Sequence, residues 1–281
     1  MESDHFWVSL SRQATNGTGY GLVFDLLVVA TFFGLMQILA FQWPDLSRFK
    51  IKRKDYLDLR NRQVSIFHGL LGIFAGAYAY ATKTHDCSAP SDNFEYSVIT
   101  CSAGYFIYDF WCMVYFNLLD FDMALHHAMS ISIWIGVLAV DRGGHIFVLS
   151  YGVSEIPNPA MHLRIVIKNM GLRYTRLYEV VEIFYFITFL FGRQLLFHPL
   201  FYTVMTCDEI FIVVRIASVG MLAQSWVFTF RMWASIKRRM AEMNERQRRG
   251  IKFHWLTPIS DKQLEECDFY KETQKFKEGL H

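Results

Sequence analysis

Two adjacent histidines, His126 and His127, stand in the stretch LDFDMALHHAMS, between two apolar stretches of the chain. The unperturbed pKa of histidine lies close to neutral pH, so a buried imidazole can serve as a general base or a proton shuttle. Asp122 precedes His126 by four residues, and a helix would place both side chains on one face, where the carboxylate could orient the imidazole. The alternative is a hydrogen-bonded histidine pair that only ties helices together.

Ionisable side chains also occur inside the other apolar stretches. The set consists of His68, Asp109, His126, His127, Glu155, Glu179, Glu182, Arg193 and Arg215. Such groups are costly in a membrane and usually face the interior of a helix bundle or a wet cavity. We therefore expect a polar or amphipathic central chamber. Glu155, in the stretch SEIPNP, could accept a hydrogen bond from a freed backbone amide or a histidine, or pair with Arg193 or Arg164 as packing.

The histidines and cysteines do not form a recognisable metal site. A membrane di-iron enzyme would show several clusters of the HxxHH type, and the chain has one HH pair. A haem held by two histidines remains an alternative, with candidate ligands His68, His126, His127 and His162. The five cysteines show neither CxxC nor mixed Cys/His spacing, so no metal is predicted there. GxSxG, P-loop and post-strand GxGxxG motifs are absent from the sequence, which leaves hydrolase and nucleotide-binding interpretations without support.

The composition is that of a membrane protein. Of the 281 residues, 53% are hydrophobic and 19% are charged, whereas an average soluble domain has about 25% charged residues. Since a membrane-spanning helix needs about 20 mostly apolar residues, hydropathy predicts seven spans. They cover 21–41, 64–81, 96–119, 126–140, 146–167, 177–196 and 208–233. Pro157 and Pro159 should break the fifth span, which is tolerated at membrane depth only inside a bundle or beside a cavity.

The distribution of basic residues orients these spans. Residues 42–63 carry seven Lys and Arg, residues 168–176 carry three, and the tail 234–281 carries eleven. The loops on the other side carry at most one each. Because positively charged loops mark the cytoplasmic side, we predict a lumenal amino terminus and a cytosolic carboxyl terminus.

Three further features lie outside the spans. Residues 1–20 show no cleavable signal peptide and hold a glycosylation sequon at Asn16, for which an unmodified segment is the simpler interpretation. Cys87 and Cys207 fall on the same predicted side, which permits a disulfide between them. The stretch KRRMAEMNERQRRGIK could form a charged helix on anionic headgroups, but we favour positive-inside topology alone.

A series of short motifs follows along the chain. Asn61-Arg62 precede the span with His68, and then come SAGYFIYDF with Asp109, LHH, SEIPNPAMHLR and the span with Arg193. This order resembles the TLC domain, a membrane fold shared by ceramide synthases, translocon-associated chain proteins and other lipid-linked proteins. The resemblance covers residues 54–240 and implies a bundle of six helices around a central chamber, preceded by one extra helix.

The resemblance to ceramide synthases is only partial at the site. In those enzymes the double histidine, which His126 and His127 match, belongs to a site that moves a fatty acyl group from coenzyme A to a long-chain base. Their next span carries a His-Asp pair and a second Asp three residues later. Here Ser154, Glu155 and Asn158 stand at those positions. The chain is therefore more similar to the non-synthase TLC-domain proteins, which are linked to membrane phospholipid composition.

The predicted fold is an all-α polytopic membrane protein with seven transmembrane helices. Its expected parts are a lumenal segment 1–20, a first transmembrane helix 21–41, a TLC domain 54–240 and a charged cytosolic tail 241–281. The family resemblance implies the endoplasmic reticulum or another endomembrane. Membrane lipids are the expected partners, and the net charge of +2 gives no reason to expect nucleic acid.

The expected function is to bind or handle an acyl-chain lipid in the chamber and to contribute to membrane lipid homeostasis, with no required cofactor. The alternative is an acyl-CoA-dependent acyltransferase, with acyl-CoA as co-substrate and Glu155 orienting the proton-accepting histidine. Whether the chain is an enzyme stays open. A third interpretation is a subunit or cargo receptor whose membrane-protein partner binds the tail. The candidate catalytic residues are His126, His127 and Glu155, and the candidate substrate-binding residues are His68, Asp109, Asn158 and Arg193.

Overall fold

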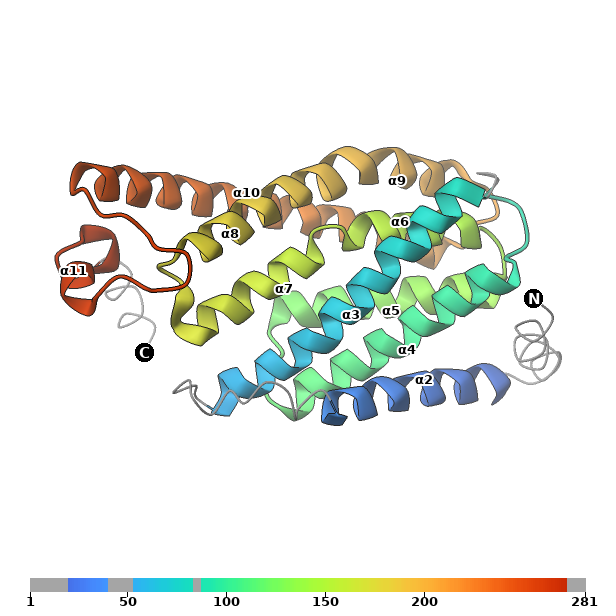
Figure 1. Ribbon diagram of the computed structural model, residues 1–281. Helices are drawn as coiled ribbons and strands as arrows, with labels where there is room; N and C mark the ends of the chain where they lie inside the picture. Colours follow the sequence, from blue (N-terminus) through green and yellow to red (C-terminus); the bar gives the residue numbers. More distant parts are fainter. Residues whose placement is uncertain (1–19, 40–52, 83–86, 272–281) are drawn as a thin grey trace.

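Figure 1 shows a computed structural model of the chain, in which residues 20–39, 53–82 and 87–271 are described. Within these ranges the regular elements are helices, apart from one isolated β-bridge between Pro90 and Arg142, which confirms the predicted all-α class. The Asn16 sequon, residues 40–41 of the predicted first span and the tail beyond residue 271 lie outside the described residues.

The helices run back and forth along one long axis. They are α2 (Tyr20–Leu39), α3 (Arg53–Thr82), α4 (Asn93–Tyr115), α5 (Phe121–Val140), α6 (Gly144–Glu155), α7 (Asn158–Ile167), α8 (Arg176–Phe189), α9 (Phe197–Thr206), α10 (Ile212–Arg248) and α11 (Asp261–Glu265), with π-helical turns η3 (Lys168–Leu172) and η4 (Leu190–Leu196). Helix α2 lies at one edge of the bundle against α4, and α10 extends beyond the other helices at the opposite corner (Figure 1).

Within the described residues, six helical segments are long and apolar enough to cross a membrane. They are Gly21–Leu39, Asp55–Thr82, Asn93–Tyr115, Phe121–Val140, Arg176–Thr206 and Ile212–Arg248. Helices α6 and α7, with 12 and 10 residues, are each shorter than the roughly 20 residues that a span requires. They follow one another in the same direction and together supply a seventh crossing (Figure 1). The chain therefore has the seven passes that its hydropathy predicts.

The predicted break of the fifth span is confirmed. Helix α6 ends at Glu155 and α7 begins at Asn158, with the buried Pro157 between them. Gly192 of η4 packs over this break, because a Cβ at that position would lie only 2.8 Å from the Val153 carbonyl oxygen. Two irregular helical segments thus meet at mid-bundle, an arrangement typical of functional sites in helices.

Several predicted span limits are wrong, chiefly because helices do not end where the apolar residues end. Helix α3 starts at Arg53 rather than residue 64, and α10 continues to Arg248 rather than residue 233. The predicted loop 197–207 is largely helix α9. Pro199 stands in the first turn of α9, where a missing amide donor costs little. Hydrogen bonding along the backbone carries each helix past its apolar part.

Helices α3 and α6 approach each other closely. A Cβ on Gly76 would lie 2.7 Å from the Gly152 Cα, so the two backbones are in direct contact there. One turn earlier on α3, Gly72 faces the ring of Tyr151. Small residues allow this kind of close packing between membrane helices. The contact places the side chains of α6 next to those in the earlier turns of α3, including His68.

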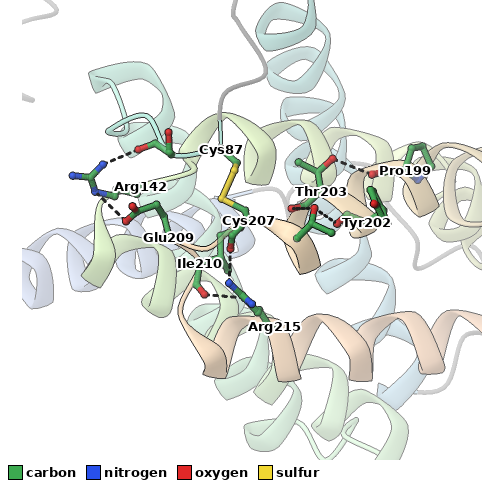
Figure 2. Close-up of a disulfide and its surroundings, with 11 residues drawn as sticks. Cys87, Arg142, Pro199, Tyr202, Thr203, Cys207, Glu209, Ile210 and Arg215 are labelled. Carbon is green, nitrogen blue, oxygen red and sulfur yellow. Dashed lines mark hydrogen bonds and ion pairs between the residues drawn. A yellow bond between two sulfur atoms is a disulfide. The ribbon is translucent and has the colours of Figure 1, made fainter.

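One end of the bundle, here called the disulfide end, joins the turns that precede α4, α6 and α10. Cys87 and Cys207 form a disulfide there, as the predicted topology permitted (Figure 2). Arg142 donates a hydrogen bond to the Ser88 carbonyl oxygen at 2.8 Å, and Arg215 donates to the carbonyl oxygens of Cys207 and Ile210 (Figure 2). This end is therefore closed by a covalent bond and by side chains that bind backbone carbonyls.

The opposite end, here called the ion-pair end, is held by charges on α7, α8 and α10. Glu182 of α8 accepts hydrogen bonds from Arg164 at 3.1 Å and from Arg239, and the latter also binds Glu242. Arg246 pairs with Glu179 one turn away on α8. The last part of α10 is thus packed against α8, so the interpretation of this segment as a helix on headgroups is wrong for its buried face.

The chain after α10 folds back onto α8. Gly250, with a φ of 67°, makes the turn, and Arg176 at the start of α8 then donates its backbone N–H to the His254 carbonyl oxygen at 2.8 Å. The Arg246 guanidinium lies 3.7 Å from the ring centre of Phe253. Tyr174, which precedes α8, is partly buried, and this burial raises the pKa of its phenol. The first part of the predicted charged tail, up to residue 271, is therefore a folded part of the protein.

Candidate functional site

A cavity of about 440 Å³ lies at the centre of the helix bundle. It is lined by residues of α3, α4, α5, α6, α7, α8, η4 and α10. All of the candidate site residues named from the sequence line it: His68, Asp109, His126, His127, Glu155, Asn158 and Arg193. Of the other ionisable residues in apolar stretches, Glu179 and Glu182 lie in the ion-pair cluster and Arg215 lies at the disulfide end.

A second, narrower pocket of about 70 Å³ continues from this chamber toward the disulfide end. Its lining is mostly apolar and includes Ile133, Trp134, Phe147, Phe197, Phe201 and Val204. The two cavities share five lining residues, which are Phe106, His126, Glu155, Arg193 and Met221. The site therefore becomes more apolar along its length, from an amphipathic chamber to an apolar pocket, with three ionisable side chains at the boundary.

The His127 imidazole ends a chain of buried hydrogen bonds. Its Nε2 lies 3.2 Å from Oδ2 of Asp109, whose Oδ1 accepts a hydrogen bond from the Asn61 side chain. Asn61 in turn accepts from the Tyr108 hydroxyl at 2.9 Å. Because an ionised carboxylate only accepts, His127 must carry its proton on Nε2. Its Nδ1 is fully buried and has no hydrogen-bond partner among the described residues, although the His127 side chain lines the cavity.

The His126 imidazole is held in the opposite tautomer. Its Nδ1 lies 3.3 Å from Oε1 of Gln224, and the Gln224 amide nitrogen donates to the Asp122 carbonyl oxygen at 2.8 Å. This second bond fixes the amide orientation, so His126 donates from Nδ1 and keeps the lone pair on Nε2. The predicted contact between the Asp122 carboxylate and His126 is wrong. That carboxylate pairs with Arg231 of α10 instead.

His68 lines the chamber but has its own partners. The Tyr151 hydroxyl lies 2.7 Å from its Nε2 and donates to its backbone carbonyl oxygen at 3.0 Å. The His68 ring also stacks on Tyr105, with ring centres 3.6 Å apart. Because Nε2 is occupied in this way, the geometry argues against His68 as a haem ligand. Among the residues that the structure describes, no group of three His, Cys, Asp or Glu is placed to hold a metal ion.

Glu155 and Arg193 lie on either side of the break between α6 and α7. Glu155 accepts a hydrogen bond from the Asn158 side chain at 2.7 Å, and not from a histidine or a freed backbone amide. Arg193 donates from Nε to the Ser154 carbonyl oxygen at 3.0 Å, in the last turn of α6 where carbonyls lack helical partners. In the described part of the chain, Glu155 forms no ion pair with Arg164 or Arg193, and Arg164 binds Glu182. Asp109, and not Glu155, is the carboxylate that orients a histidine of the pair.

Sequence reasoning missed several lining residues. Tyr105, Tyr151 and Gln224 carry no charge at neutral pH, so a search for histidines and charged side chains in apolar stretches could not find them. His162 was considered only as a haem ligand, yet it lines the chamber, and its Nδ1 accepts from Arg62 at 3.2 Å. Its position four residues after Asn158 on α7, about one helical turn, was the available signal.

The model of one protein family matches most of this region. The TLC domain model aligns with residues 58–240. The chain belongs to the TLC-domain family. The match runs from α3 into α10, so it contains every candidate site residue and leaves α2 and the folded tail outside. Together with the apolar helices, it makes the chain a multi-pass membrane protein of this family. No solved structure matches the chain.

Proposed function

We propose that this TLC-domain protein binds an acyl-chain lipid inside the bundle and thereby contributes to membrane lipid homeostasis. The observation that carries the proposal is the continuous site, in which a polar chamber of about 440 Å³ opens into a narrow apolar pocket. A polar head group would lie among the side chains of the chamber, and the chain would lie in the pocket. Binding of this kind requires no cofactor.

The energetics of the two compartments support an amphiphilic ligand. Ser130, Ser150, Ser154 and Ser218 also line the pocket, but most of the surface that it exposes is apolar, and an alkyl chain gains about 0.8 kcal/mol for each methylene buried there. In the chamber the reverse holds, because buried histidines, Glu155 and Arg193 favour groups that hydrogen-bond with them. Ligand sites commonly combine apolar walls with a few placed polar groups.

A matched pair of substitutions on α5 tests this proposal. Ser130 lines the apolar pocket, whereas Ser132 on the same helix lines neither cavity and bonds to its own helix at 2.8 Å. Native mass spectrometry of the protein purified in mild detergent should show a bound acyl lipid in the wild type and in Ser132→Phe. Ser130→Phe should lose it, because the ring fills the pocket. Equal lipid retention in both variants, or no lipid in the wild type, would reject the proposal.

A second candidate is acyl transfer from acyl-CoA, and the geometry of His127 favours it. Asp109 holds this histidine in the tautomer whose Nδ1 would accept a proton from a hydroxyl or amine once the side chains that cover Nδ1 move aside. The acceptor oxygen or nitrogen would form a bond to the acyl carbon as the thioester carbon–sulfur bond breaks and coenzyme A leaves as the thiol. Arg62, Arg164 and Arg231 line the chamber and could attract the phosphates of coenzyme A.

Release of the coenzyme A thiol separates this candidate from simple binding. The purified protein would be incubated with acyl-CoA and a panel of lipid amines and alcohols. Thiol release that depends on the acceptor and falls at least about 100-fold in Asp109→Asn and His127→Ala would support transfer, as general-base catalysis contributes about 10²–10⁴-fold. If the wild type releases no more thiol than His127→Ala, it is not an acyl-CoA transferase for these acceptors, while the binding proposal stands.

The proposed orientation places the disulfide end in the lumen of an endomembrane such as the endoplasmic reticulum, and the carboxyl terminus in the cytosol. Disulfides persist in oxidising compartments, and the Cys87–Cys207 bond lies at the end opposite the basic residues of α10. Protease added to sealed microsomes should therefore remove a tag placed after His281. Protection of the tag in sealed vesicles, with cleavage after detergent, would reverse the orientation.

A partner that binds the tail remains a third proposal. The side chains of Trp255 and Leu256 are more than half exposed on the folded-back segment and offer a contact surface. Deleting the tail from residue 241 would also remove Glu242 and Arg246 from the ion-pair cluster, so its effects could not be assigned. Substitution Leu256→Ser avoids this problem. Unchanged recovery of membrane proteins by affinity purification of this variant would count against a partner at this surface.

A further inference from the structure

The segment that follows α10 leaves two large apolar side chains exposed. We call residues 250–260 the tail loop. Elsewhere in this folded segment apolar side chains are buried, and Ile259 and Cys267 are only 7% and 0% exposed. Trp255 and Leu256, by contrast, are 57% and 65% exposed. Adjacent apolar side chains on the surface of an otherwise folded segment indicate a contact surface rather than a scattered surface residue.

The tail loop is fixed to the helix bundle. The first two residues of α8 donate their backbone N–H groups to the carbonyl oxygens of His254 and Trp255, at 2.8 and 3.3 Å. These are donors that the first turn of a helix cannot satisfy by itself. Further along the chain, the Glu245 carboxylate of α10 accepts hydrogen bonds from the backbone N–H groups of residues 268–269. The tip of the loop therefore keeps a defined position relative to α8.

The start of α8 lies at the surface of the membrane. The membrane-crossing segment that begins there, Arg176–Thr206, has 31 residues, which corresponds to about 46 Å at about 1.5 Å per residue. Because a bilayer with its headgroups is about 40–45 Å thick, Arg176 falls in the headgroup layer. Exposed apolar side chains on α8 begin about one turn later, at Val180 and Ile183. Figure 1 shows that the tail loop returns from the end of α10 to the start of α8, so it lies at headgroup depth.

The side chains of the tail loop suit this depth. Tryptophan is enriched in the headgroup layer because its indole has an apolar body and a polar N–H group. The Arg176 guanidinium lies 5.3 Å from the centre of the Trp255 ring, and arginine can bind a phosphate through two parallel hydrogen bonds. Lys252 is exposed on the same loop, and residues 250–260 contain neither Asp nor Glu. A phosphate group would therefore meet positive charge beside an apolar anchor.

Two features favour a lipid surface over a protein partner at this loop. A stable protein interface takes about 800 Å² and about 20–30 residues from each partner, whereas the tail loop exposes two large apolar side chains. The loop also adjoins the exposed apolar surface of α8, so the bilayer that surrounds α8 reaches it. In the proposed orientation this is the cytoplasmic leaflet, whose anionic lipids attract Lys and Arg next to a span.

We propose that the tail loop is a membrane-surface anchor that binds anionic phospholipids. Trp255 and Leu256 enter the boundary between the headgroups and the acyl chains, and Arg176 and Lys252 bind headgroup phosphates. The contact holds the folded part of the tail, and with it the end of α10, against the bilayer. It is made by the loop and not by a helix lying on the headgroups. It is also separate from the chamber, so it does not depend on the lipid site proposed there.

A photoreactive side chain at the tip of the loop tests the depth. Full-length Leu256→p-benzoylphenylalanine and, separately, Trp255→p-benzoylphenylalanine would be placed in nanodiscs of phosphatidylcholine and phosphatidylserine. Irradiation should attach phospholipid at both positions, which mass spectrometry detects. The control is Glu265→p-benzoylphenylalanine, because Glu265 is exposed on α11, farther from the bundle, and it should attach no lipid (Figure 1).

The outcomes of this experiment separate a lipid surface from a protein partner. Two probe positions are used so that one poorly folded variant cannot decide the result. Absence of lipid at both loop positions, or equal lipid attachment at Glu265, would overturn the proposal. Attachment of both loop positions to one protein in native membranes, in place of lipid, would also overturn it and would assign this surface to a partner. None of these results depends on whether the chamber binds a lipid.

The share of phosphatidylserine among the attached lipids tests the charged part. With the probe at Leu256, this share should exceed that of the nanodisc. Arg176→Gln or Lys252→Gln should lower the excess by up to about fivefold, as expected for one basic residue near an anionic surface. Arg176→Gln keeps the backbone bond to His254, and Lys262→Gln removes an exposed charge on α11 and should change nothing. A share equal to that of the nanodisc would overturn the assignment to anionic lipids.

Discussion

The two ends of the bundle are held by different chemistry. At the disulfide end, a covalent bond and hydrogen bonds to backbone carbonyls close the turns (Figure 2). At the ion-pair end, the buried Glu182 and the partly buried Glu179 of α8 bind arginines of α7 and α10. On the second side, the exposed Asp120 and Arg231 belong to the lining of the chamber.

This difference indicates that the disulfide end is held rigidly, whereas the ion-pair end borders the entrance to the chamber. The apolar pocket ends near the disulfide end. A rearrangement there would open the site at the end opposite its entrance. Arg164, by contrast, belongs both to the ion-pair cluster and to the chamber lining, so the charges that join α7, α8 and α10 also border the entrance. Ion pairs can exchange partners with an entering anionic group, which a disulfide cannot do.

The largest expected effect is at the ion-pair end. Glu182→Ala removes the carboxylate shared by Arg164 and Arg239 and leaves both arginines near the protein interior with fewer counter-ions. Breaking a buried pair in this way costs about 3–5 kcal/mol. Thermal unfolding in detergent should show a correspondingly lower midpoint than in the wild type. A midpoint within experimental error of the wild type would show that the cluster does not stabilise this end.

A smaller loss is expected from opening the disulfide end. Replacing Cys87 and Cys207 by serine should cost about 2–4 kcal/mol, because the bond closes a loop with a sequence separation of 120 and restricts the unfolded chain. Reductant should lower the unfolding midpoint of the wild type to that of the double variant and leave the variant unchanged. Equal midpoints of the oxidised and reduced wild type would contradict a stabilising role.

The smallest effect is expected for an exposed charge at the disulfide end. Glu209 lies 3.8 Å from Arg142, and both side chains are nearly half exposed. Exposed pairs of this kind contribute about 0–1 kcal/mol, so Glu209→Ala should leave the unfolding midpoint almost unchanged. This variant is the matched control for Glu182→Ala, and a comparable loss in both would mean that burial of the charges is not what distinguishes the two ends.

Much of the fold could be predicted from the sequence because the membrane constrains it strongly. Apolar length and basic loops predicted seven passes, and Pro157 predicted the break between α6 and α7. The candidate site residues were found for the same reason, since an ionisable side chain in an apolar span usually faces the interior. His68, Asp109 and Glu155 illustrate this, as each lines the chamber.

The partners of these residues could not be predicted, because they lie on other helices. Helical spacing suggested Asp122 for His126, but the packing of α5 on α10 brings Gln224 and Arg231 closer to the two side chains. Asp109 reaches His127 only through the packing of α4 on α5. Neutral lining residues such as Tyr151 gave no signal at all. Distances between helices decide these pairs, and no single-helix pattern contains them.

Photo-crosslinking with an acyl lipid that carries a terminal diazirine tests the central claim most directly. If the acyl chain lies in the pocket, mass spectrometry should find the label on pocket-lining residues such as Trp134 and Phe201. Excess unlabelled lipid should remove the label. Labelling confined to lipid-facing side chains such as Phe230, and unaffected by competitor, would contradict an intramembrane lipid site.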